Sequence, residues 1–157
     1  MMADGSIYEG EWLSNEFKGH GSLKTEREIY IGEWQGSKRN GKGTSYTAHG
    51  ARYEGEWRDD VKHGLGVECN PDKSRYDGSW VDGVRCGEGL FVWSNGKTYS
   101  GEWQHGKAHG QGKFEYDDGT TYTGGWAAGV PHGPGEYTLA GGTVKTGEWC
   151  NGELVRA

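Results

Sequence analysis

Apolar side chains are scarce in this chain, since only 32% of its 157 residues are hydrophobic. A composition this poor in apolar surface is typical of disordered segments, because little burial is available to offset the entropy of ordering. No stretch is apolar over the length that a signal peptide or transmembrane helix needs. Apolar residues also never recur at i, i+3, i+4 and i+7. We therefore expect no membrane span and essentially no helix.

Clusters of basic residues are missing as well. The 17 Lys and Arg residues face 23 Asp and Glu residues, for a net charge of −6, and no basic run occurs. Nucleic-acid binders and anionic-membrane binders concentrate positive charge, so a nucleic-acid partner is not expected and membrane contact is only an alternative. Three cysteines without CxxC spacing (Cys69, Cys86, Cys150) cannot all pair. This usage fits a reducing compartment, and we expect a cytoplasmic protein.

Glycine and aromatic residues are abundant instead. The chain has 31 glycines, about three times the average usage, and 13% of its residues are aromatic. Disordered segments are poor in aromatic residues. Because the two residue types are also regularly spaced, we expect an ordered chain.

The spacing is that of a tandem repeat. Tyrosines recur at intervals of 22 or 23 residues, at Tyr8, Tyr30, Tyr53, Tyr76, Tyr99 and Tyr122. A tryptophan follows each by four residues, at Trp12, Trp34, Trp57, Trp80, Trp103 and Trp126. A Gly-x-Gly step follows each tryptophan by seven residues, starting at Gly19, Gly41, Gly64, Gly87, Gly110 and Gly133. The sequence thus predicts six complete repeats and a partial seventh, with Lys145 in the Tyr place, that ends near Gly152.

Each repeat is predicted to be a β-hairpin. Tyr-x-Gly-Glu-Trp alternates with period 2, which places Tyr, Gly and Trp on one face and Glu on the other. The second strand is the Gly-x-Gly segment, and steps such as Asn95-Gly96 and Asp118-Gly119 supply the positive φ of tight turns. The glycines leave space for the rings and let backbones approach closely. One such hairpin is too small to fold alone, so neighbouring repeats must share burial.

The unit from Tyr99 to Gly119, with Tyr-Ser-Gly-Glu-Trp followed by Gly-Gln-Gly and Asp-Gly, resembles the MORN repeat (membrane occupation and recognition nexus). The resemblance covers Tyr8 to about Gly152, and we treat residues 1–157 as one repeat array. It implies an elongated single-layer antiparallel sheet that curls into a groove. It also implies a scaffold or targeting module, because relatives occur in radial spoke heads, parasite cytoskeletons, junctophilins and plant phosphatidylinositol phosphate kinases.

The sequence departs from the pattern in four places. The first turn between repeats, at Thr25–Glu28, is one residue short and has no glycine. Ser79 and Gly125 replace the repeated glutamate in the fourth and sixth repeats. Pro134 lies within a Gly-x-Gly step, where a strand loses a hydrogen-bond donor. The lysine in the seventh Tyr place ends the ladder of tyrosines.

The Tyr and Trp side chains have two interpretations: the core of a single-layer sheet, or a stripe that binds a ligand. We expect the core role for most of them, with ring edges exposed in the groove. The residues predicted to line a protein-binding groove are Tyr30, Trp34, Tyr53, Trp57, Tyr76, Trp80, Tyr99 and Trp103, with Glu33, Glu56 and Glu102 favouring a basic partner.

Catalytic and metal-binding chemistry are not expected. Repeated glutamates about 10 Å apart are too distant to share one ion. His63, Cys86, His109 and His132 lie in register before Gly-x-Gly, but the same one-repeat spacing prevents them from converging on zinc or forming a Cys–His pair. The Gly-x-Gly steps also lack a phosphate-loop pattern. We expect no enzyme activity and no cofactor.

The sequence therefore predicts a cytoplasmic scaffold that binds a helical or extended segment of a partner protein, in a cytoskeletal or ciliary/flagellar assembly. One alternative is a membrane-targeting module that binds phosphoinositides, and another is the regulatory array of a larger enzyme. Neither end of the array shows a cap, so self-association through open sheet edges is a further expectation.

Overall fold

The computed structural model describes residues 2 and 4–157, and all regular structure in them is β-strand. Seven strands begin the hairpins: β1 (Ile7–Leu13), β3 (Glu28–Gln35), β5 (Arg52–Arg58), β7 (Arg75–Val81), β9 (Thr98–Gln104), β11 (Thr121–Ala127) and β13 (Val144–Cys150). Seven complete them: β2 (Glu16–Lys24), β4 (Lys38–Thr47), β6 (Val61–Cys69), β8 (Val84–Val92), β10 (Lys107–Glu115), β12 (Val130–Thr138) and β14 (Glu153–Arg156). The all-β hairpin prediction is confirmed. Strand β13 falls in the partial seventh repeat, and β14 lies beyond the end predicted for it near Gly152.

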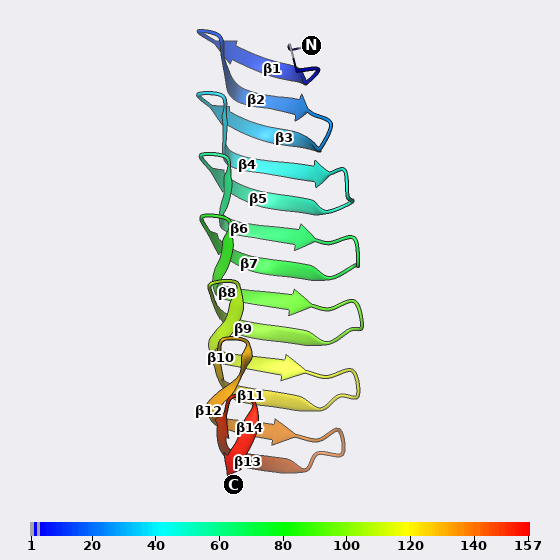
Figure 1. The fold of residues 1–157 in the computed structure, drawn as a ribbon, viewed down its shortest axis with the longest axis vertical. Coiled ribbons are helices and arrows are strands. Elements are labelled where there is room, and N and C mark those ends of the chain that lie inside the picture. The colour runs from blue at the N-terminus through cyan, green and yellow to red at the C-terminus, as the bar shows by residue number, and fades with distance from the viewer. Residues whose placement is uncertain (1, 3) are drawn as a thin grey trace. The chain divides into compact units, whose positions relative to one another are not determined.

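The strands form one antiparallel sheet of 14 strands that is not closed. Each strand pairs with the next one along the chain, so the order in the sheet is the order in the sequence (Figure 1). By internal packing the chain divides into two compact units. The N-terminal unit comprises the described residues up to Lys73 with Trp80–Gly83, and the C-terminal unit comprises Ser74–Ser79 with Val84–Ala157.

The turn inside each hairpin requires two residues in the left-handed region. In the third repeat these are Asp59 (φ 47°) and Asp60 (φ 71°), and in the fifth they are His105 (φ 50°) and Gly106 (φ 76°). Two consecutive positive φ values match the right-handed twist of the flanking strands. A turn residue then donates its amide N–H to the previous repeat, as Gly106 does to the Arg85 carbonyl at 3.0 Å.

The turns between repeats follow the predicted pattern except in the first turn and in the third, where Lys73 (φ 71°) occupies the glycine position. Gly50, Gly96 and Gly119 have φ between 81° and 89°, as an Asn/Asp-Gly type of turn requires. The short first turn has no residue at positive φ. Instead, the Thr25 hydroxyl oxygen closes the turn by accepting hydrogen bonds from the amide N–H groups of Arg27 and Glu28, at 3.2 and 3.0 Å. A Thr side chain thus substitutes for the missing glycine.

A β-bulge interrupts the hairpins at the start of Gly-x-Gly. The register of β5 and β6 shifts between Gly55 and Glu56, and the two extra residues on the second strand are Gly64, at φ 63°, and Leu65. The second glycine of the step, Gly66, lies opposite Gly55. This is the bend that the paired glycines predicted.

Candidate binding face

The tyrosine and tryptophan rings form a continuous ladder on one face of the sheet in each unit. The Tyr53 ring lies between Trp57 of its own repeat and Trp80 of the next, with centroids 5.1 and 5.4 Å away and planes nearly perpendicular. In the C-terminal unit Tyr99 has the same arrangement between Trp103 and Trp126, at 5.2 and 5.0 Å. Edge-to-face contact of this kind stabilises aromatic pairs beyond the area they bury.

Hydrogen bonds fix the rings of this ladder. The Tyr53 hydroxyl donates to the Glu56 carbonyl in its own repeat at 3.0 Å. The indole N–H of Trp57 donates backwards, to the Gly43 carbonyl in the second strand of the preceding repeat, at 3.1 Å. The same backward bond joins Trp103 to Gly89 at 3.0 Å. In the second to sixth repeats, the ladder tryptophan therefore ties its repeat to the one before it.

Glycines make room for the tyrosine rings. The ring of Tyr53 lies across Gly66, where an added Cβ would be 2.3 Å from the hydroxyl oxygen and 2.5 Å from Cζ. The tyrosines are consequently among the most buried side chains, with Tyr30, Tyr53, Tyr76 and Tyr99 at most 2% exposed. Burial raises the pKa of Tyr30 and of Tyr76 to about 12.

The eight aromatic residues predicted to line a groove are all buried, five in the N-terminal unit and three in the C-terminal unit. Trp34, Trp57, Trp80 and Trp103 are 3–7% exposed. These aromatic residues lie at the bottom of the ring face. Contact between them and a partner protein stays a prediction.

The three predicted glutamates point to the other face of the sheet, because they alternate with the tyrosine and tryptophan. Their carboxylates brace the bulge. Glu33 accepts the amide N–H of Lys42 at 3.2 Å, Glu56 that of Leu65 at 3.3 Å, and Glu102 that of Gln111 at 2.8 Å. They therefore line a different surface from the rings, and a role for them in binding also stays a prediction.

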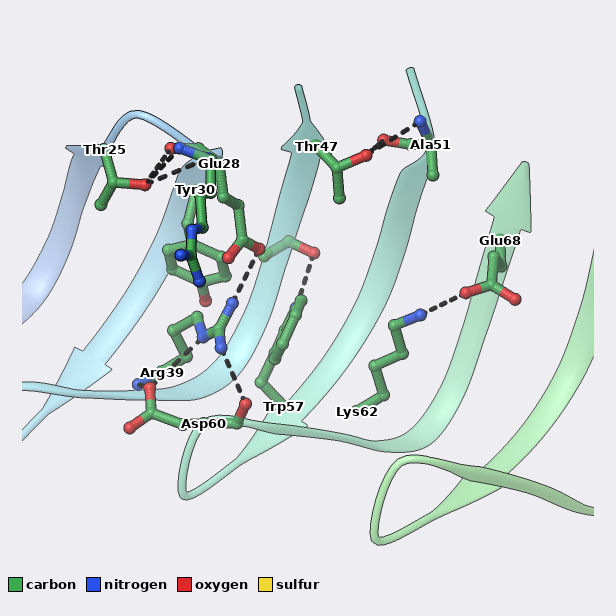
Figure 2. Close-up of polar contacts among 12 residues, drawn as sticks. Thr25, Glu28, Tyr30, Arg39, Thr47, Ala51, Trp57, Asp60, Lys62 and Glu68 are labelled. Atoms are coloured by element: carbon green, nitrogen blue, oxygen red, sulfur yellow. Dashed lines mark hydrogen bonds and ion pairs between the residues drawn. The ribbon is translucent and has the colours of Figure 1, made fainter. Parts of the chain in front are cut away.

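Basic side chains cover the rings of the N-terminal unit (Figure 2). Arg39 lies opposite Trp34 in the hairpin and places its guanidinium 4.2 Å from the Trp57 centroid and 5.6 Å from that of Tyr30. Lys62 lies 4.9 Å above Tyr53 and 4.8 Å above Trp80. Such cation–π contacts are strongest where water is partly excluded.

Carboxylates neutralise these two cations. Arg39 donates to Glu28 Oε1 at 2.8 Å through Nη1, to Asp60 Oδ1 at 3.3 Å through Nε, and to the Asp60 carbonyl at 3.0 Å through Nη2. Lys62 pairs with Glu68 (Figure 2). Sequence reasoning missed this network, although Arg39 and Lys62 share one position in consecutive repeats, five residues after the tryptophan.

An open pocket of about 330 Å³ lies on the ring face beside this network. Its floor is Tyr53 and Trp57, and its walls include Arg39, Lys62 and Thr47. The small side chains of β4 leave this space. The pocket therefore combines aromatic surface with paired charges of both signs.

The C-terminal unit is different, because aromatic side chains from the second strands cover its rings. Phe91 and Phe114 lie opposite Tyr99, and Tyr137 lies opposite Tyr122. Trp93 and Tyr116 follow two residues after the two phenylalanines. These five residues, which we call the aromatic stripe, were not predicted as site residues; their recurrence at 23-residue intervals is the signal that identifies them.

The described residues contain neither a metal-binding cluster nor a membrane-spanning helix. No group of three or more His, Cys, Asp or Glu side chains within residues 4–157 is placed to hold a metal ion. The part of the chain that the structure describes contains no helix long and apolar enough to cross a membrane.

Known proteins were then compared with this architecture. The family model described as the MORN repeat matches six segments: residues 8–25, 30–50, 53–75, 76–98, 99–121 and 122–144. No curated protein sequence matches.

Among solved structures, the chain is similar to the SAS-4 (dCPAP) TCP domain of Drosophila melanogaster, solved in complex with a proline-rich motif of Ana2 (dSTIL). The sequences are 13% identical, the TM-score is 0.52, and the match covers 82% of this chain and 71% of that one. At this identity the likeness concerns the fold. The six matched segments span most of the sequence and begin at the six repeated tyrosines, and the chain belongs to the MORN-repeat family.

Proposed function

We propose that this chain is a non-catalytic scaffold that binds a segment of a partner protein on its ring face, within a cytoskeletal or ciliary assembly of the cytoplasm. The observation that carries the proposal is the open pocket of the N-terminal unit, which has an aromatic floor and both charge signs in its walls. Sites for peptides combine apolar contact with a few polar groups that fix orientation. The repeat family and the likeness to a centriolar domain solved with a peptide support it.

The ring face is a better candidate than the glutamate face. Each predicted glutamate already accepts a backbone N–H, so its carboxylate has a structural task. The ring face has an open pocket whose walls place side-chain donors and acceptors above its aromatic floor. Extended peptides use such a combination, with pockets for their side chains.

Phosphoinositide targeting draws less support from the pocket. Arg39 and Lys62 are paired with Glu28, Asp60 and Glu68, so a phosphate would have to displace carboxylates that already hold these cations. Membrane binding is therefore the less supported function, and the following experiment distinguishes it from protein binding.

The test is detergent extraction of the tagged chain from its own cells, followed by imaging. Retention on a filamentous or microtubule-based structure is expected. Release with the detergent-soluble lipid would refute the scaffold and favour membrane targeting.

Two matched variants identify the face that is used. Thr47→Trp fills the pocket with the residue that Trp93 supplies at the same repeat position, and we expect it to release the protein from the insoluble structure. Glu54→Lys reverses a charge on the glutamate face without removing a bulge brace, and retention should persist. The opposite pattern would assign binding to the glutamate face.

A further inference from the structure

The aromatic stripe of the C-terminal unit is continuous from one repeat to the next. Ring centroids are 4.5 Å apart for Phe91 and Trp93, 5.3 Å for Trp93 and Phe114, 4.6 Å for Phe114 and Tyr116, and 6.1 Å for Tyr116 and Tyr137. Neighbouring planes are inclined by 57–66°, so no two rings stack face to face. The rings therefore meet edge to face or tilted and form one continuous aromatic surface.

The stripe lies at the surface and is not needed to close the core. Phe91 is buried, but the other four side chains are only partly covered. The corresponding positions of the N-terminal unit are occupied by Leu23, Ser45, Thr47 and Glu68 on the strands, with Thr25 and Asn70 in the turns. The same hairpin thus forms without aromatic residues at these places, and their presence in the C-terminal unit needs another reason.

The spacing of the stripe matches a polyproline II helix. Neighbouring strands lie about 4.8 Å apart, so the step from Phe91 to Phe114, and from Phe114 to Tyr137, is about 9.6 Å. A polyproline II helix rises about 3.1 Å per residue and repeats every third residue, which gives about 9.3 Å per turn. A segment lying across the strands would present every third side chain to a new repeat.

Positive charges border the stripe. The Arg85 guanidinium lies 4.8 Å from the Phe91 centroid, the Lys97 ammonium lies 5.9 Å from that of Tyr116, and Lys145 is the cross-strand partner of Tyr137. One cation thus lies at each end of the stripe and one along its length. Although the whole chain is acidic and Asp118 lies near Lys97 and Tyr116, the three cations favour carboxylates between the ligand's apolar anchors.

We propose that the aromatic stripe binds a proline-rich segment in the polyproline II conformation, with prolines at i, i+3 and i+6 and acidic residues between them. Each proline packs against the rings of one repeat, and the acidic residues face Arg85, Lys97 and Lys145. This conformation loses little entropy on binding because it is preformed, and aromatic surfaces are its usual receptors. The inference rests on the proposed scaffold function and names the ligand chemistry of its C-terminal unit.

The experiment measures binding of two synthetic peptides to the full chain by calorimetry. One carries prolines at i, i+3 and i+6 with glutamates between them, and the other has the same composition with prolines at i, i+2 and i+6. The three-residue spacing should bind about tenfold more tightly, since loss of one well-seated anchor costs about 1.4 kcal/mol. Equal affinity of the two peptides, or binding of neither, would overturn the proposal.

Substitutions that introduce residues of the N-terminal unit at equivalent positions of the aromatic stripe locate the binding site. Phe114→Ser introduces the residue found at Ser45, and Tyr116→Thr introduces that of Thr47; each should weaken the correctly spaced peptide about tenfold while circular dichroism stays unchanged. Tyr46→Ser removes an exposed aromatic side chain from the glutamate face and should leave affinity unchanged.

Other occupants of the stripe give different results. Binding to phosphatidylserine-containing vesicles that is lost in Phe114→Ser would assign the stripe to a membrane, and a dimer lost in the same variant would assign it to a second copy; both would overturn the proposal. If the peptides fail but the chain is still retained on detergent-resistant structures in cells, only this inference fails and the scaffold function stands.

Discussion

At the scale of single residues, the fold depends on glycines that lie beneath tyrosine rings. Gly66 is the clearest case, because the Tyr53 ring occupies the space where a side chain would begin. Glycine is normally unfavourable within a strand, since it loses the most conformational entropy and contributes no packing. Here the close approach of the ring outweighs that cost.

A single added methyl group should therefore destabilise the protein strongly. We expect Gly66→Ala to lower the free energy of unfolding by about 3 kcal/mol, because the ring must leave its site between two tryptophans. Urea denaturation followed by tryptophan fluorescence measures the change. Gly141→Ala is the control: a Cβ there meets nothing within 4 Å, and its effect should stay within about 0.5 kcal/mol. Equal losses in the two variants would contradict the steric explanation.

At the scale of the structural element, one repeat can replace another. Thr98 precedes Tyr99 as Thr121 precedes Tyr122, so deletion of residues 99–121 joins equivalent positions. The indole of Trp126 would then meet the Gly89 carbonyl in place of Gly112.

This deletion is expected to leave a folded sheet. The dependence of unfolding free energy on urea should fall by about 15%, in proportion to the lost chain, because that slope follows the surface exposed on unfolding. Deletion of residues 99–110 is the matched control, since it removes most of β9 and the first four residues of β10 and so breaks the pairing between neighbouring hairpins. Circular dichroism should show a sheet in the first variant only; loss of structure in both would mean that repeats are not interchangeable.

The repeated parts of the fold could be predicted from the sequence because each carries its own local signal. Tyr-x-Gly-Glu-Trp and Gly-x-Gly fix the alternation and the bend, and the structure has them as expected. The hydrogen bonds by which the repeated glutamates stabilise the β-bulge were not predicted. The glutamates were interpreted as a binding ladder because a sequence does not show that an accepting carboxylate lies beside the amide of Leu65 or Gln111.

The candidate site was harder to predict than the fold, because it lies in positions that vary between repeats. Ser45 and Phe114 occupy one place in the hairpin, and only the second adds to an aromatic surface. Residues that differ between repeats are not part of the shared pattern, so the pattern does not identify them. The pairing of Arg39 with Asp60 was equally hidden, since the two are 21 residues apart and belong to different repeats.

At the scale of the whole molecule, the buried tyrosines make stability sensitive to alkali. Burial holds the pKa of Tyr30 and Tyr76 at about 12, above the ordinary value of 10.0, and raises the pKa of Tyr53 and Tyr99 as well. The folded state therefore keeps phenolic protons that the unfolded state releases. This stabilisation is complete below pH 10 and is lost as the pH rises from 10 to 12.

We expect unfolding in this window, with the rise of tyrosinate absorbance and the loss of circular dichroism occurring together. Tyrosinate absorbance that is complete near pH 10 in a protein with unchanged circular dichroism would contradict the prediction.

The backward direction of the tryptophan hydrogen bonds also gives the molecule an order of assembly. Trp34 bonds to Gly21, Trp57 to Gly43 and Trp103 to Gly89, so the acceptor always precedes the donor in the chain. Every strand pairs with its sequence neighbour, which gives the low contact order that favours fast folding. During synthesis, each emerging hairpin thus finds its docking surface already made by the hairpin before it, and the sheet can grow at the pace of translation.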